Sequence, residues 1–399
     1  MVTQSPLNLS LLLISLALLI SLSVTPDWIS SLPKVAGMVL GLGAFFVVWH
    51  HSRQEKGWWV ALVFFLILGS GVAMLGALST TWVTAKFQLL APLLAKLPSI
   101  LLRLPGAPNG FQPNEVAGSI LWVLPVMGCL AVALLGKGQT RKAWALPLLA
   151  GALFSLAVLA LTQSRSAWLA LAIAGTLAIF LVLPRKARLA LLVIFLLVVV
   201  AAGYGITSGQ LGRLVSTTMP NAQAVNPAYL LSDIQLRQVI WQGAIMGLRD
   251  FPLTGMGMNI FRSELGRLYP WYGMTRTGDY AHAHNEFLQA GLDLGLPGLL
   301  AFTSLYLIAF WLLWRSYKQS SLNKQQSAIS NQQSTIQKAL ILGLGTGLLA
   351  HLLFGMTDAV ALGAKPGILF WLLLGLIAGL YQTEKRKGIN YPSSGNRPA

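Results

Sequence analysis

Cysteine and charged residues are the two things this chain has least of. Of its 399 residues one is cysteine, Cys129, and it stands inside an apolar run. A disulfide within the chain or a cysteine metal cluster is therefore excluded. Only 10% of the residues are charged, whereas a soluble globular protein carries roughly 25%. With 55% hydrophobic residues and a mean hydropathy of +0.67, the chain is predicted to reside in a lipid bilayer.

Long hydrophobic runs account for most of the sequence. A helix needs about 20 apolar residues to cross the hydrocarbon core. Ten segments approach or reach this length: residues 7–24, 33–49, 57–79, 116–135, 143–161, 166–183, 188–206, 294–314, 338–357 and 363–381. No charged residue falls well inside any of them, which favours their insertion. The first has no basic flank and no small-residue cleavage site, so we expect a retained span. The sequence predicts an all-α fold, with one polytopic membrane domain over residues 1–399.

The basic excess of the chain is explained by membrane topology. If the N-terminus is cytoplasmic, the cytoplasmic segments are residues 50–56, 137–142, 184–188, 315–338 and the C-terminal tail. They hold 16 of the 28 Lys and Arg residues and two of the 11 acidic residues, a net +14 out of +17. Positive charge gathers on the cytoplasmic side of membrane proteins. Both termini are therefore predicted to be cytoplasmic, and nucleic acid is not needed to explain the charge.

In this topology two large polar pieces lie outside the cytoplasm. Residues 207–293 form the largest extracytoplasmic loop, and within it Ser232–Leu248 repeats apolar residues at helical spacing. Residues 80–115 begin with an amphipathic stretch, Trp82–Leu104, which we expect to lie in the plane of the membrane interface.

Ionisable side chains from distant parts of the sequence converge on this outer face. Arg165 lies in the turn LTQSRSAW, Arg237 in the large loop, His284 at the end of that loop, and Asp358 after the ninth span. A histidine at the border of water and membrane can act as acid or base near neutral pH. An arginine fork suits phosphate oxygens. The convergence predicts a functional site with His284 at its centre.

Each candidate also has an ordinary structural explanation. An isolated histidine is usually structural, arginines snorkel from membrane helices, and an aspartate such as Asp358 often ends a helix. An arginine in a short outer turn, however, runs against the positive-inside rule, so Arg165 calls for a use. His282 would face away from His284 on a helix and is secondary. Four carboxylates show no spacing that demands a metal: Glu115, Asp279, Glu286 and Asp293.

Four motifs resemble, in order, those of the O-antigen ligase and polymerase superfamily. Three come first: PNEVAG (113–118), TQSRSAWLAL (162–171), and RQVIWQGA (237–244) followed by PLTGMGMNIF. The fourth is H-N-x9-G-x-x-G, made by His284, Asn285, Gly295 and Gly298. The resemblance covers residues 110–300, and Asp358 is a match beyond them.

The resemblance implies a GT-C-like, metal-independent glycosyltransferase of the lipid A-core:surface polymer ligase type. The donor would be a glycan on undecaprenyl pyrophosphate, and the acceptor a hydroxyl on a glycan, lipid or protein. His284 matches the catalytic histidine, and Arg165 and Arg237 match the arginines that bind pyrophosphate. Asn285 and Asp358 complete the expected substrate-binding set, with no metal and no other cofactor.

The resemblance also implies a place and a span count. The active site would face the periplasm at the bacterial inner membrane, in lipopolysaccharide biosynthesis. The family typically has about twelve spans of membrane-crossing length, so residues 80–115 are expected to hide a pair of short or re-entrant spans. The total is therefore expected to be about 10–12 spans, ten without this pair and twelve with it.

Three activities remain open on the sequence. A ligase is slightly favoured because the histidine motif is complete, and a polymerase of the same superfamily differs mainly in its acceptor. Relatives have also been labelled inorganic-carbon transporters. A transporter should carry polar or broken helices near mid-membrane, whereas the ionisable groups here gather at one face, which favours an enzyme.

Overall fold

The computed structural model describes residues 5–80, 110–135, 138–190, 227–270, 280–322, 328–360 and 362–390, with three single positions between 81 and 109. Every regular element within these ranges is helical. Eight of the helices are long and apolar enough to cross a membrane, and α1 is a shorter apolar helix. The prediction of an all-α polytopic membrane protein is therefore confirmed.

The helices follow the predicted spans closely. Their bounds are α1 Asn8–Ser23, α2 Trp28–Ser52, α3 Glu55–Ser79, α5 Pro113–Leu135, α6 Gly138–Thr162, α7 Arg165–Val182, α10 Pro227–Asp250, α11 Phe261–Leu268, α12 Glu286–Leu322, α13 Ala328–Gly355 and α14 Ile368–Asn390. Nine of the ten predicted spans coincide with one of them. The remaining predicted span, 188–206, lies almost wholly outside the described residues. The same is true of the predicted interfacial stretch 82–104. The domain limits 1–399 and the extracytoplasmic loop 207–293 stay predictions.

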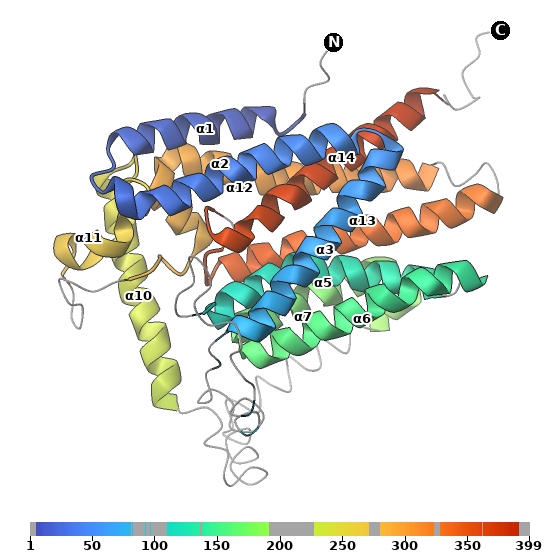
Figure 1. Ribbon diagram of the computed structural model, residues 1–399, viewed down its shortest axis with the longest axis horizontal. Coiled ribbons are helices and arrows are strands. Elements are labelled where there is room, and N and C mark those ends of the chain that lie inside the picture. Colours follow the sequence, from blue (N-terminus) through green and yellow to red (C-terminus); the bar gives the residue numbers. More distant parts are fainter. Residues whose placement is uncertain are drawn as a thin grey trace.

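Burial divides the bundle into a core and a lipid-facing rim. In the most apolar 18-residue stretch of α14, 89% of the residues are buried inside the bundle. In the corresponding stretch of α7 only 22% are buried. The α14 helix packs against α2, α3 and α12, while α5 lies between α13 and α6 (Figure 1). Rim helices expose large side chains such as Val47 and Val182. Such surfaces are favourable only next to lipid, because exposed apolar patches of this size are rare on soluble monomers.

Helices α10 and α11 cover one end of the bundle. The α10 helix crosses that end, with α11 beside it (Figure 1). They share a small apolar cluster with the first turns of α12, made by Ile240, Ala244, Met256, Phe261, Leu265, Ala283 and Leu292. The predicted amphipathic helix Ser232–Leu248 lies within α10. Apolar contacts in this cluster hold α10 and α11 against the start of α12.

A break in α12 fixes the position of its first two turns. Gly295 has φ 70° and ψ −179° inside the helix, a conformation essentially restricted to glycine. The turn after α10 lies against the break, where Met256 N–H donates to the Leu292 carbonyl and Leu296 N–H to the Pro252 carbonyl, both at 2.7 Å. These bonds satisfy backbone groups that would be costly to leave unpaired next to the membrane. The apolar pattern predicts a span that starts at residue 294, eight residues after the helix begins.

We expect Gly295→Ala to destabilise the protein. The added Cβ would clash with the Leu253 carbonyl oxygen, and the backbone conformation alone costs a residue with a side chain about 1–3 kcal/mol. Thermal unfolding in detergent measures the loss. Gly43→Ala and Gly71→Ala are matched controls, because a Cβ there meets nothing within 4 Å. Equal melting temperatures for all three variants would contradict this account of the break.

Candidate functional site

The chain before α12 is held in a fixed, strained shape. Asn285 caps the helix, since its Oδ1 accepts the N–H groups of Phe287 and Leu288, each at 3.0 Å. The Ala283 N–H donates to Gln289 Oε1 at 2.8 Å. Between these two anchors His284 adopts φ 47°, a left-handed conformation that few residues other than glycine adopt. The strain is maintained by the anchors, and such strain is typical of functional sites.

Two imidazoles meet one buried carboxylate. Asp358, which follows α13, has a side chain that is 4% exposed, against 27% for His282 and 28% for His284. The His282 Nε2 lies 3.4 Å from Asp358 Oδ1, and the His284 Nδ1 lies 3.8 Å from the same oxygen. The two rings are 4.3 Å apart and inclined at 62°. The histidines therefore form the accessible layer and the aspartate the layer beneath it.

The backbone selects the tautomer of His282. The N–H of His284 donates to His282 Nδ1 at 3.1 Å, so Nδ1 carries a lone pair. In a neutral imidazole the proton then sits on Nε2, which faces Asp358. Burial, followed by the charges of His284, Lys34 and Arg237, lowers the pKa of His282 to about 4, although Asp358 acts in the opposite direction. His282 is thus a neutral N–H donor at pH 7.

Asp358 is the charged member of the group. Burial alone would raise the pKa of this carboxyl. The nearby His284 and His282 imidazoles and the Ala359 N–H outweigh burial and lower the pKa below its ordinary value of 3.8. The Ala359 bond is 3.0 Å long. An ionised carboxylate beside an imidazole stabilises the protonated form of that imidazole, which is what a general base needs.

The same three side chains have the composition of a metal site. Their ligand atoms lie within 4.8 Å of one another. A metal on His282 Nε2, however, would need the lone pair there, and the proton would have to move to Nδ1, against the His284 N–H that now donates to it. His282, His284 and Asp358 are therefore better arranged to hold a proton between an imidazole and the carboxylate than to bind a metal ion through His282.

Helix α10 contributes two side chains to this group. Arg237 donates to the carbonyl of Thr357, the residue before Asp358. One turn later, Trp241 Nε1 donates to the His284 carbonyl at 3.4 Å. The predicted residues His284, Asn285, Arg237 and Asp358 are thus brought together.

Arg165 comes from a different helix at the same end of the bundle. It is the first residue of α7, it is half-buried, and α7 packs along α13, which leads to Asp358. The start of α5 lies at this end as well, because Glu115 is within electrostatic range of both Asp358 and Lys365. The packing puts the start of α7 at this end of the bundle, and a role of Arg165 in the group stays a prediction.

Several supporting residues were missed by reasoning from sequence. Asp293, which is 1% exposed, accepts the Asn259 N–H and Gln289 Nε2, each at 3.0 Å, and forms an ion pair with Lys34. Gln289 in turn holds Ala283 beside the strained His284. The spacing of Gln289 and Asp293, four apart on one helix face, was the available signal.

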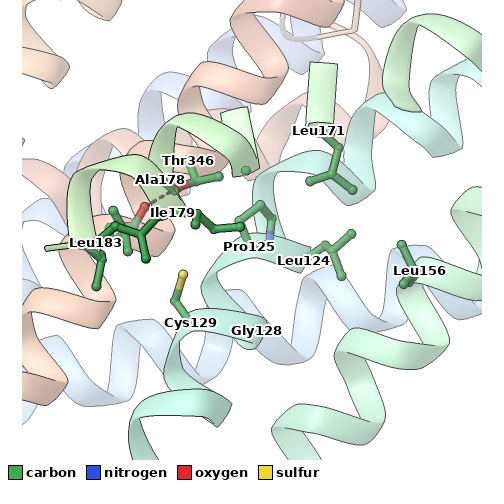
Figure 2. Close-up of a pocket in the computed structure, with 13 residues that line it drawn as sticks. Leu124, Pro125, Gly128, Cys129, Leu156, Leu171, Ala178, Ile179, Leu183 and Thr346 are labelled. Carbon is green, nitrogen blue, oxygen red and sulfur yellow. Dashed lines mark hydrogen bonds between the residues drawn. The ribbon is translucent and has the colours of Figure 1, made fainter. Parts of the chain in front are cut away.

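An apolar cavity lies between α5, α6, α7 and α13 (Figure 2), and neither His282 nor His284 lines it. Its volume is about 480 Å³. The hydroxyl of Thr346, at its edge, donates to the Leu342 carbonyl at 2.7 Å. The remaining lining is Leu124, Pro125, Gly128, Cys129, Leu156, Leu171, Gly175, Ala178, Ile179, Val182 and Leu183.

Residues 150–303 match a protein-family model described as O-antigen ligase. The matched range includes Arg165, Arg237, His284 and Asn285, and it ends before Asp358. No curated protein matches the chain significantly.

We expect protein stability to fall as the pH drops from about 6.5 towards about 4, the ordinary and the folded pKa of His282. In this window the unfolded chain binds a proton that the folded chain excludes, so acid favours unfolding. His282→Gln removes the titration and should reduce the loss between pH 7 and pH 4.5 by about 1–2 kcal/mol. Melting temperature against pH measures it, with the exposed His50→Gln as control. Identical pH dependence in His282→Gln and wild type would refute the assignment.

Proposed function

Residues 150–303 make the chain a member of the O-antigen ligase superfamily, and on that premise we propose that it is a glycosyltransferase of the ligase type. It moves a glycan from undecaprenyl pyrophosphate to an acceptor hydroxyl, at the periplasmic face of the bacterial inner membrane. The observation that carries the proposal is His284 beside the buried, ionised Asp358, with Arg237 of α10 donating to the carbonyl of Thr357, the residue before Asp358.

His284 is the proposed general base. Its Nδ1 faces Asp358, which leaves Nε2 for the acceptor hydroxyl. As the acceptor oxygen bonds to the anomeric carbon, its proton passes to Nε2 and the bond from that carbon to the pyrophosphate oxygen breaks. Attack opposite the leaving group inverts the configuration. Asp358 stabilises the imidazolium while the charge is present.

Arg165 and Arg237 are the proposed pyrophosphate ligands. Negative charge develops on the leaving group, and fixed cationic donors stabilise it without a metal ion. A guanidinium has five N–H donors, so Arg237 can donate to the Thr357 carbonyl and still bind phosphate oxygens. Asn285 and Asp358 stay proposed members of the substrate-binding set.

The apolar cavity is the proposed site for part of the polyprenyl tail. Its lining includes α7 residues from Leu171 to Leu183, and α7 begins with Arg165. A carrier whose pyrophosphate lies at Arg165 could therefore follow α7 into the membrane and bury its tail against apolar side chains.

We expect His284→Ala to abolish transfer while protein level and donor binding stay near wild type, because the variant lacks the base and keeps both arginines. General bases contribute about 10²–10⁴-fold to such rates. Transfer from carrier-linked glycan in vitro measures the effect, with His50→Ala as control. Wild-type rates in His284→Ala would sink the mechanism. Loss of wild-type activity on adding a chelator would count against metal independence.

The glycan pools of cells that lack the protein separate the candidate activities. We expect long chains stranded on the lipid carrier, because a ligase moves finished chains. Acceptors that carry single repeat units would instead identify a polymerase. Unchanged pools together with altered solute uptake would identify a transporter and overturn the proposal.

A further inference from the structure

The first residues of α12 hold the segment that carries Asp358 at two points. Asn285 Nδ2 donates to the Met356 carbonyl at 3.1 Å. Glu286 Oε1 accepts the Val360 N–H at 3.1 Å. These two contacts lie two residues before and two residues after Asp358, so they bracket it symmetrically.

We propose that Asn285 and Glu286 are positioning residues that set the distance between His284 and Asp358. The two follow His284 directly in the chain, so a short, capped piece of backbone carries the base and both contacts. This inference rests on the proposed function for its catalytic meaning, while the contacts themselves have a structural test.

The burial of Glu286 supports a positioning role. Its carboxylate is 1% exposed, and burying a charge is unfavourable unless it is paired and hydrogen-bonded. The helix does not need it as a cap, because Asn285 supplies the cap. Its Oε2 instead accepts the Tyr306 hydroxyl at 3.3 Å and lies 3.5 Å from His351 Nδ1. It is thus directed at α13 and the segment beyond.

Glycine at position 355 permits this approach. A Cβ on Gly355 would lie 2.8 Å from Glu286 Oε2 and 3.3 Å from Glu286 Cβ. Gly355 is the last residue of α13. The Glu286 carboxylate therefore packs against the C-terminal end of that helix.

The other partners of Glu286 are themselves fixed. Tyr306 and His351 are 1% and 0% exposed, and the Tyr306 hydroxyl lies 3.2 Å from His351 Nδ1. The His351 ring stacks on Trp122 of α5, with centroids 4.0 Å apart. Glu286, which accepts the Val360 N–H, is therefore held by contacts that run through α12, α13 and α5. Through Val360 it fixes the position of the segment that follows α13.

Variants at Glu286 separate the contact from the charge. Glu286→Ala removes the acceptor of the Val360 N–H, whereas Glu286→Gln keeps an oxygen acceptor. With the carrier-linked glycan of the deletion strain as donor, we expect Ala to lower kcat about tenfold or more with KM within about twofold, since misplacement near 1 Å can cost about 10²-fold. Gln should restore most of kcat. Equal losses in Gln and Ala, or wild-type kcat in Ala, would overturn the proposal.

Variants at Asn285 separate positioning from helix capping. Serine is a good N-cap but has no amide donor for the Met356 carbonyl. We expect Asn285→Ser to melt near wild type and yet to lose kcat as Asn285→Ala does. Full activity in Asn285→Ser would overturn the role of this residue.

Two readouts exclude a general folding defect. A displaced Asp358 should shift the acid limb of kcat/KM against pH in Glu286→Ala, whereas a smaller folded fraction lowers the whole curve without a shift. Hydrogen exchange in peptides that contain Val360 should rise in Glu286→Ala and not in Ser52→Ala, which removes a buried hydroxyl in α2 that donates to the Val48 carbonyl. An unshifted limb and unchanged exchange would refute the inference.

Hydrogen exchange at Val360 also distinguishes a failure of the proposed function from a failure of the positioning inference. If the deletion strain accumulates no carrier-linked glycan, the proposed function fails, and raised exchange at Val360 would still support the positioning contact. If transfer occurs and exchange is unchanged, the positioning inference fails alone.

Discussion

Three buried carboxylates govern the architecture of the site, because a buried charge must be surrounded by partners. Glu286 and Asp293 are each 1% exposed and Asp358 is 3% exposed. Each has partners from parts of the chain far from its own position. Asp293 has them from α2 and the turn after α10, Glu286 from α13 and the segment beyond, and Asp358 from the two histidines before α12. The need to satisfy these groups brings five distant segments to one end of the bundle, and the site is the place where they meet.

The two histidines have the same side chain and opposite roles. The backbone N–H of His284 commits His282 to one tautomer, and burial keeps it neutral. His282 can then donate to Asp358 without competing for a proton. His284 has its Nδ1 toward the same carboxylate oxygen, so its other nitrogen is the one that can exchange protons with a substrate. The hydrogen bond from the His284 N–H to His282 Nδ1 thus gives the two histidines different roles: His282 donates to Asp358, and His284 is the proposed base.

The spans were predictable from sequence, and most contacts of the site were not. Hydropathy located nine of the helices because apolar length is a local property. Alternating topology brought Arg237, His284 and Asp358 to one face, because each span reverses the direction of the chain. The two glycines of the motif look alike in sequence, yet Gly295 breaks the helix and Gly298 does not. That difference depends on Leu253, which approaches from another segment. The spacing of Glu286 and Asp293 demands no metal, and spacing cannot reveal partners such as Val360 and Lys34.

The strong burial of α14 has a consequence for biosynthesis. This helix follows every other described helix in the chain, and its apolar window is the most buried of all the spans, at 89%. Its packing partners α2, α3 and α12 therefore leave the ribosome and enter the membrane before the helix that fills the space between them. Membrane helices insert individually and associate afterwards, so the earlier spans must remain loosely assembled until α14 arrives. The segment of Asp358 leads directly into α14, and the site thus becomes complete at the same late step as the core.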